Sequence, residues 1–126
     1  MIPEDKGVVF AEGSPQRALV EFIKAWAEAD FDGMLAQTQL TWRATVPSPK
    51  ELLKAMFRFK PVRVRVLEES LKNDVVYEAE VSVEFFLARS VIKANTLTAK
   101  VICEKEPLFP SADGTWGVNP VTMMVS

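Results

Sequence analysis

The 126-residue sequence contains no histidine and a single cysteine, and both shortages exclude kinds of chemistry. Without histidine, the chain lacks the side chain that most often moves protons near neutral pH. One cysteine, Cys103, cannot form an internal disulfide, and alone it leaves no ligand set typical of a transition metal. We therefore expect no metal and no cofactor, and we expect a reducing compartment, the cytoplasm.

The chain also lacks a basic excess and a long apolar run. Its 15 Lys and Arg and 17 Asp and Glu give a formal net charge of -2, whereas a nucleic-acid binder normally carries positive charge to neutralise phosphates. No apolar stretch approaches the length of about 18 residues that a membrane helix requires. The N-terminal residues 1–6 have no basic start followed by an apolar run, so they do not resemble a secretory signal. We expect neither nucleic acid nor membrane as a partner.

The first half of the chain is predicted to be helical. Ser14-Pro15 is a typical helix start, because the hydroxyl caps a backbone amide and proline fits the first turn. A first helix is predicted from there to about Asp30. Its apolar stripe consists of Leu19, Phe22, Ile23 and Trp26.

Two further helices are predicted before residue 62. The second begins at Asp30 or Asp32 and ends near Trp42. Its inward positions are Phe31, Met34, Leu35 and Thr38. The third is short: residues 48–51 have the pattern of a capping box with proline at the first helical position, and Lys60-Pro61 ends it.

From residue 62 the apolar period changes from 3.6 to 2, which is typical of strands with one buried face. We predict strands over 62–66, 77–85, 97–104 and 116–125, joined by a turn at 71–74, a connection at 88–95 and a loop at 107–114. The face predicted to meet the helices carries Val62, Val64, Val66, Tyr77, Ala79, Val81, Val83, Phe85, Leu97, Ala99, Val101, Cys103, Trp116 and Val118.

Helices followed by antiparallel strands predict an α+β fold. Three N-terminal helices should pack in the concave face of a curved antiparallel sheet, so that the whole forms a cone. We expect one domain over residues 14–126, and an N-terminal segment, 1–13, that is a short strand or disordered.

Four features together match a known family. They are the capped helix 14–28, the second helix that runs into Thr41-Trp42-Arg43, the short third helix, and the closing segment 114–120 with its G-x-W-x-V pattern. In this order they resemble the nuclear transport factor two-like superfamily, a cystatin-like curved sheet around helices, over nearly the whole chain. The resemblance implies a cone whose mouth often holds a ligand, in a superfamily of isomerases, dehydratases, epoxide hydrolases, transport adaptors and proteins without known activity. Fold therefore leaves function open.

The enzymes of that superfamily place carboxylates or a histidine inside the cone, and this chain departs from that pattern. The predicted inner face carries one carboxylate, Glu68, near a strand end, without a second polar group to hold an oxyanion. Cys103 lies in an apolar strand and is interpreted as a small buried hydrophobe. We predict no catalytic residue, and a small isomerase or hydrolase that uses Glu68 is the alternative.

Five aromatic residues are expected to face the cone: Trp26, Trp42, Tyr77, Phe85 and Trp116. They either line a pocket for a small apolar ligand or simply fill the core. The first reading predicts a non-catalytic small-molecule-binding or accessory domain. The second predicts a homodimeric interaction or assembly protein with a filled cone.

The outer face of the sheet carries both charged and apolar residues. Glu78, Glu80 and Glu84 are interpreted as a solvated face that pairs across strands with Arg63, Arg65 and Lys100. The apolar residues predicted on this face are Phe86, Ile102, Val121, Met123 and Val125. A contiguous apolar patch often marks an interface, so we predict a two-fold homodimer through it. A bulge in the last strand, or coverage by residues 8–10, would remove the patch.

Overall fold

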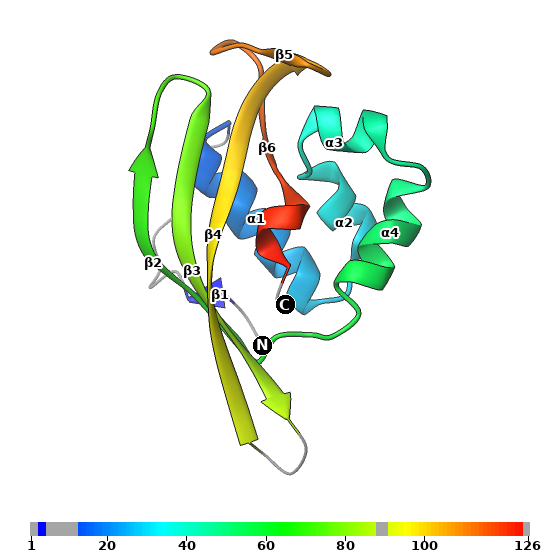
Figure 1. The fold of residues 1–126 in the computed structure, drawn as a ribbon, viewed down its shortest axis with the longest axis vertical. Helices are drawn as coiled ribbons and strands as arrows, with labels where there is room; N and C mark the ends of the chain where they lie inside the picture. Colours follow the sequence, from blue (N-terminus) through cyan, green and yellow to red (C-terminus); the bar gives the residue numbers. More distant parts are fainter. Residues whose placement is uncertain (1–2, 5–12, 88–90, 125–126) are drawn as a thin grey trace.

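The structure is a computed structural model that describes residues 3–4, 13–87 and 91–124, with the backbone alone for 3–4, 86–87 and 91–93 (Figure 1). In chain order the elements are β1 (Pro3–Glu4), α1 (Pro15–Ala27), α2 (Phe31–Ala36), α3 (Leu40–Thr45), α4 (Pro49–Met56), β2 (Arg63–Leu71), β3 (Val76–Leu87), β4 (Val91–Glu106), β5 (Phe109–Pro110), β6 (Thr115–Val118) and the 3₁₀ helix η2 (Pro120–Met123). The fold is α+β with helices packed on one face of a curved, unclosed sheet, as predicted.

Helix α1 begins where the sequence predicts. The Ser14 hydroxyl accepts a hydrogen bond of 3.2 Å from the Arg17 backbone amide, and Pro15 occupies the first turn. The helix ends at Ala27, just before Ala29, whose φ of 55° is left-handed. All four residues of the predicted stripe are at most 2% exposed: Leu19, Phe22, Ile23 and Trp26.

The predicted second helix is two helices. Asp30 caps α2 through a 3.0 Å bond from the Gly33 amide to its carboxylate, but the helix stops at Ala36. The break has a tertiary cause, because the buried Thr38 forms an isolated parallel β-bridge with Val118 of the last strand. A chain that pairs as a strand at Thr38 cannot be helical there, so α3 starts afresh at Leu40.

Helix α4 starts at Pro49 as predicted, but the capping box does not form. Ser48 has a left-handed φ of 47°, and its side chain makes no capping hydrogen bond. Its carbonyl instead accepts the Leu52 amide at 3.0 Å, the first bond of the helix.

The sheet has the strand order β1-β2-β3-β4-β5, and β6 also pairs with β4. The β1–β2 pair is parallel, and the pairs among β2, β3, β4, β5 and β6 are antiparallel. Strand β4 begins at Val91, so residues 91–95, predicted as part of a connection, form a strand instead. The hairpin of β3 and β4 therefore extends beyond the helices at the lower end of Figure 1.

The predicted last strand, 116–125, is wrong beyond residue 118. Strand β6 ends at Val118, and Asn119 starts the 3₁₀ helix η2 by accepting the Val121 amide with its side chain at 3.2 Å. Pro120 follows in the first turn of η2, where its missing N–H costs nothing. Asn119-Pro120 is a local signal for a helix start, and here it prevails over the strand alternation that predicts residues 119–125 as a strand.

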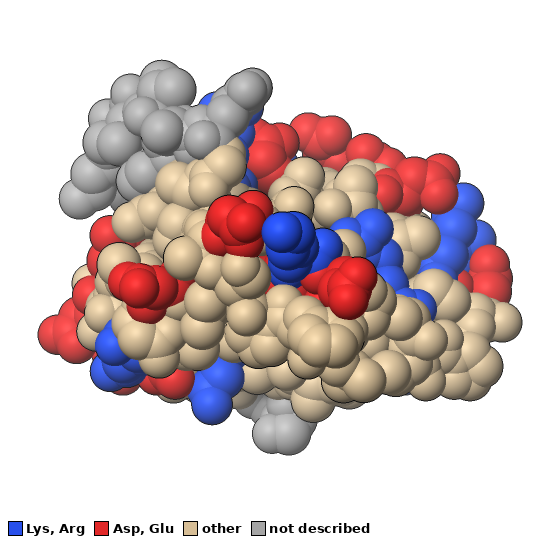
Figure 2. All heavy atoms as spheres, turned by 90° about the horizontal axis from the view of Figure 1, so that it is seen from above, with Lys and Arg blue, Asp and Glu red and all other residues tan. Residues whose placement is uncertain are grey.

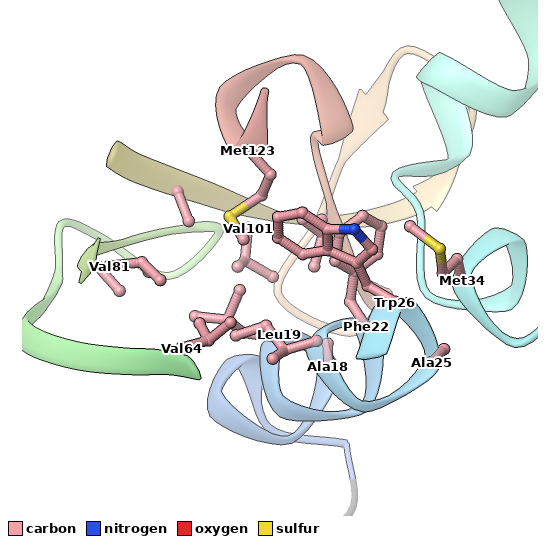
Figure 3. Close-up of a cluster of buried hydrophobic side chains, with 14 of the residues drawn as sticks. Ala18, Leu19, Phe22, Ala25, Trp26, Met34, Val64, Val81, Val101 and Met123 are labelled. Carbon is pink, nitrogen blue, oxygen red and sulfur yellow. The ribbon is translucent and has the colours of Figure 1, made fainter. Parts of the chain in front are cut away.

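The core lies between α1 and the concave face of the sheet (Figure 3). Leu19, Phe22 and Trp26 project from α1 toward Val64, Val81 and Val101 of the strands. Met123, which is fully buried, closes the cluster from η2. The buried inner positions of the sheet agree with the predicted period of 2: Val64, Tyr77, Ala79, Val81, Val83, Ala99, Val101, Cys103 and Val118.

Charges of both signs are interspersed on the face seen in Figure 2. Acidic and basic side chains lie near one another there, separated by neutral ones, and no field of one sign covers that view. This mixture fits the net charge of -2. Among the described residues, no helix has both the length and the apolar character needed to cross a bilayer.

Candidate functional site

The five aromatic residues predicted to line a pocket lie in the core or against it. Trp26, Trp42 and Tyr77 are at most 8% exposed, whereas Phe85 and Trp116 are partly buried and pack against the core cluster. The Trp26 ring lies 5.9 Å from the Phe85 ring. The side chains expected to face the cone therefore largely pack against one another.

Trp26 shows how tightly the cone is packed. Its ring meets Phe57 nearly edge-on, with centroids 5.1 Å apart and an interplanar angle of 72°. Its indole nitrogen donates to the Phe59 carbonyl at 3.0 Å, so the polar atom of this buried ring is satisfied.

A hollow of about 370 Å³ lies beside Trp116, between α1 and β6. Trp116 is the one residue of the predicted pocket set that lines it. We call this hollow the Trp116 groove and define it by its lining residues: Gly13, Ser14, Arg17, Ala18, Glu21, Gln37, Gly114, Thr115 and Trp116. The α1 contribution is a single stripe at i, i+3, i+4 and i+7, next to the stripe that enters the core.

The walls of the Trp116 groove combine an indole with charged groups. On the α1 side, the Arg17 guanidinium contacts the Glu21 carboxylate at 3.0 Å, and both side chains are 35% exposed. On the β6 side, the Trp116 indole nitrogen makes no hydrogen bond to a described residue, although its ring packs against the core. The residues that line the groove thus bring an indole and an ion pair to one hollow.

The backbone of Trp116 also lacks a partner among the described residues on the side away from β4. In an antiparallel pair, alternate residues direct their N–H and C=O groups to opposite edges. The Val118 N–H donates to the Gln37 carbonyl at 2.7 Å, and the Val118 carbonyl accepts the Gln39 amide at 2.8 Å, so both backbone groups of Val118 point away from β4. The backbone groups of Trp116, two residues earlier, must point the same way, and no described residue bonds to them.

Gly117 fixes the position of β6 beside the groove. A Cβ on Gly117 would lie 2.6 Å from both the Gln39 Cα and the Thr38 carbonyl oxygen, closer than real contacts allow. The glycine between tryptophan and valine in the closing pattern is therefore needed because the backbone of residues 38–39 lies directly against it.

Glu68 does not lie on the inner face, and the prediction is wrong there by one residue. A β-bulge between Val66 and Glu68 shifts the register of β2, so that Glu68 pairs with the outer Glu80 and Glu69 pairs with the inner Ala79. One extra residue in a strand moves every following side chain to the opposite face of the sheet. The inward carboxylate is consequently Glu69.

Glu69 accepts a hydrogen bond of 3.0 Å from the Tyr77 hydroxyl and one of 3.4 Å from the Gln16 side chain. Burial of Tyr77, and then its bond to the Glu69 carboxylate, raise the pKa of the Tyr77 hydroxyl above its usual value. Glu69 itself is exposed, and its contacts satisfy the polar end of a buried tyrosine. Among the described residues, the two polar groups that contact it, the Tyr77 hydroxyl and the Gln16 amide, both donate to the Glu69 carboxylate itself.

Glu104 is a buried carboxylate that strand alternation placed on the outer face. It is 2% exposed, because α3 and the turn after β4 enclose this end of the strand. Its carboxylate accepts the Thr41 amide at 3.0 Å and also the Thr41 hydroxyl, which in turn accepts the Leu108 amide at 2.8 Å. The α3 cap position, Gln39, provides no side-chain bond, so Glu104 caps that helix from another element.

The outer-face charges pair largely as predicted. Arg63 binds Glu84 across β2 and β3, which lowers the pKa of the Glu84 carboxyl, and Lys100 lies 3.7 Å from Glu78. Glu80 lies opposite Glu68 and not opposite a Lys or Arg. Within the described part of the chain, no group of three His, Cys, Asp or Glu side chains is arranged to hold a metal.

Cys103 is a buried free cysteine in β4, as interpreted from the sequence. Burial raises the pKa of its thiol, which keeps it protonated and unreactive near neutral pH.

The outer apolar patch does not form as predicted. Met123 lies in the core, because η2 turns it inward, and Val121 is 56% exposed on η2 rather than on a strand. Ile102 is partly buried on β4. The side chain of Phe86 and the whole of Val125 lie outside the described residues.

The chain is similar in fold to solved structures of three proteins. Two contain a SEC-C motif: one from Rhodopseudomonas palustris (TM-score 0.64, 18% identity, covering 87% of this chain and 78% of that one) and one from Psychrobacter arcticus (TM-score 0.68, 10% identity, 96% and 67%). The third is a ketosteroid isomerase-like protein from Erwinia carotovora atroseptica (TM-score 0.54, 15% identity, 86% and 92%). No protein-family model and no curated sequence matches the chain. At these identities the likeness shows the fold alone.

Proposed function

We propose that this chain is a non-catalytic, ligand-binding accessory module of the nuclear transport factor two-like superfamily, and that the Trp116 groove is its binding site. One observation carries the proposal: Trp116, whose indole nitrogen and outward backbone groups make no hydrogen bond to a described residue, lies on the wall of a hollow of about 370 Å³. Ligand sites typically occupy hollows of about 300–1,000 Å³. The lining of this one is of mixed polar and apolar character.

The proposed site lies beside the cone core rather than within it. Trp26, Trp42 and Tyr77 are committed to core packing, so a ligand among them would have to displace close contacts. Trp116 keeps one side in the core and the other on the groove. The ring packs against the core, and its indole nitrogen makes no hydrogen bond to a described residue.

The proposal is non-catalytic because the described lining of the groove provides no unengaged base. Its carboxylate, Glu21, is held by Arg17 at 3.0 Å. A general base must reach the proton that it removes and needs a second group to stabilise the charge that develops. The inward carboxylate Glu69 is bound by Tyr77 and does not line the groove.

A set of fluorinated aromatic amides and carboxylates tests the proposal by ligand-observed ¹⁹F relaxation. We expect several compounds to bind wild-type protein and to bind Trp116→Leu at least about tenfold more weakly, a loss of about 1.4 kcal/mol. Trp42→Phe, which changes a buried ring outside the groove, is the matched control and should bind as wild type does. Equal affinity of Trp116→Leu and wild type would place the site elsewhere.

The second candidate is a homodimeric assembly protein, now through the edge of β4 rather than the outer face. The Lys100 N–H donates to the Thr122 hydroxyl, and the Lys100 carbonyl accepts the Asn119 amide, so both backbone groups point away from β3. Because the direction alternates along a strand, the backbone groups of Ala94, Thr96 and Thr98 point to that same edge of β4. No described residue pairs with that edge, and an antiparallel pair of such edges is self-complementary.

Light scattering on Thr96→Pro tests the dimer. Proline there removes an N–H that makes no bond within the described sheet, so the monomer should keep its fold while the dimer dissociates. Asn95→Pro, which removes an N–H directed at β3, is the contrasting variant and should destabilise the fold. A wild type that is monomeric at micromolar concentration contradicts this candidate.

A further inference from the structure

We infer that the Trp116 groove takes an extended peptide segment, which pairs with the backbone of Trp116 as a short added strand beside β6. This inference rests on the proposed function and names the class of ligand for the same groove.

The edge of β6 carries an interrupted strand pairing. Residues 37–39 pair with Val118 in parallel, through bonds of 2.7 Å and 2.8 Å. The same pairing would next reach Trp116, but the chain before Gln37 is helix α2 and turns away. The pairing therefore stops after one residue and leaves the Trp116 N–H and C=O directed away from β4 without a described partner.

A ligand that satisfies this edge must present an acceptor and a donor along one line. An extended peptide does so at every second residue, which is how added strands are recognised. A simple aromatic compound could stack on the indole but would leave the backbone groups bonded to water. The edge thus favours peptide over a purely aromatic ligand.

The groove has room for a short segment. Its α1 wall runs from Ser14 to Glu21, a distance of seven residue steps, or about 10 Å at 1.5 Å per residue. An extended chain rises about 3.3 Å per residue, so roughly three residues fit.

The two walls would contact different side chains of such a segment. Side chains of a strand alternate between its two faces. One set would lie on the Trp116 ring, and the other would face the Arg17–Glu21 pair or the Gln37 amide. An apolar residue between two small or polar ones is the sequence that this arrangement favours.

The test compares two probes and leaves the protein unchanged. The first is the capped tripeptide N-acetyl-Ala-Leu-Ala-N-methylamide, and the second is the same peptide methylated on its amide nitrogens. We expect the first to shift the backbone amide resonance of Trp116 saturably and the second to bind at least about tenfold more weakly. The Val118 amide, already bonded to Gln37, should shift less and is the internal control.

Two results would overturn the inference. One is a tripeptide that leaves the Trp116 amide unshifted, or that binds no better than its methylated analogue. The other is slow hydrogen exchange at the Trp116 amide of the free protein, because that group would then already be bonded. If the fluorinated aromatic compounds bind while the tripeptide does not, the inference fails and the proposed function stands.

Discussion

Tyr77 is the single tyrosine of the chain, and its buried hydroxyl donates to the Glu69 carboxylate at 3.0 Å. Burial and this bond both favour the neutral hydroxyl, so its pKa in the fold lies above the unfolded value of about 10. The stabilisation that results is complete below pH about 10 and is lost as the pH rises toward the folded pKa.

We predict that ultraviolet difference absorbance will show no tyrosinate in folded protein at pH about 10, where an unperturbed tyrosine is half ionised. In guanidinium chloride the same residue should titrate near that pH. Tyr77→Phe should remove the alkaline signal in both states, which identifies its source. A folded protein whose tyrosine titrates near pH 10 would contradict the buried, hydrogen-bonded hydroxyl.

Glu104 is the second residue whose environment predicts a measurable effect. We expect Glu104→Ala to lower the free energy of unfolding by about 1–3 kcal/mol, because it leaves the Thr41 amide and hydroxyl without their acceptor. Glu106→Ala, on an exposed position of the same strand, should change it by no more than about 0.5 kcal/mol. Urea denaturation compares the two, and equal effects would mean that Glu104 does not cap α3.

At the scale of elements, β6 and the segment 37–39 determine the shape of the groove. Gly117→Ala should destabilise the protein by about 1–3 kcal/mol, because the added Cβ would meet the backbone of Thr38 and Gln39 at 2.6 Å. Thr115→Ala, an exposed change in the same strand, is the control. Thermal denaturation in which the two variants melt alike would show that β6 is not pressed against this segment.

The sequence predicted the elements that depend on local signals and missed those set by tertiary pairing. Helix α1 follows from the Ser14 cap and a clear apolar stripe, and both are present. The break between α2 and α3 comes from the bridge of Thr38 to Val118, which lies far away in sequence. The bulge after Val66 carries no glycine to announce it, and it moved the inward carboxylate from Glu68 to Glu69.

The candidate site was predictable only in part. Trp116 stood out because the closing pattern and the strand period both placed it at the helix-facing surface. Its groove partners come from α1 and the end of α2, and they are joined by packing that no spacing in the sequence records. An exposed helix stripe such as Arg17 and Glu21 looks the same in sequence whether or not a groove lies beside it.

At the scale of the whole molecule, the fold is shared with proteins as different as SEC-C motif proteins and a ketosteroid isomerase-like protein. A fold of this kind supports many functions, so function has to be argued from the site. In this chain the cone interior is occupied by its own aromatic residues, and the groove is lined by Trp116, whose indole nitrogen makes no hydrogen bond to a described residue. The central claim is that binding takes place in the groove and not inside the cone.

The most direct test is the ¹H–¹⁵N spectrum of the three tryptophan indoles, recorded during titration with the fluorinated compounds that bind. Trp116→Leu assigns the groove signal by its loss. We predict that binding shifts the Trp116 indole signal and leaves the Trp26 signal, which is bonded to the Phe59 carbonyl, in place together with that of the buried Trp42. Shifts at Trp26 and Trp42 with an unmoved Trp116 would contradict the account and return the site to the interior of the cone.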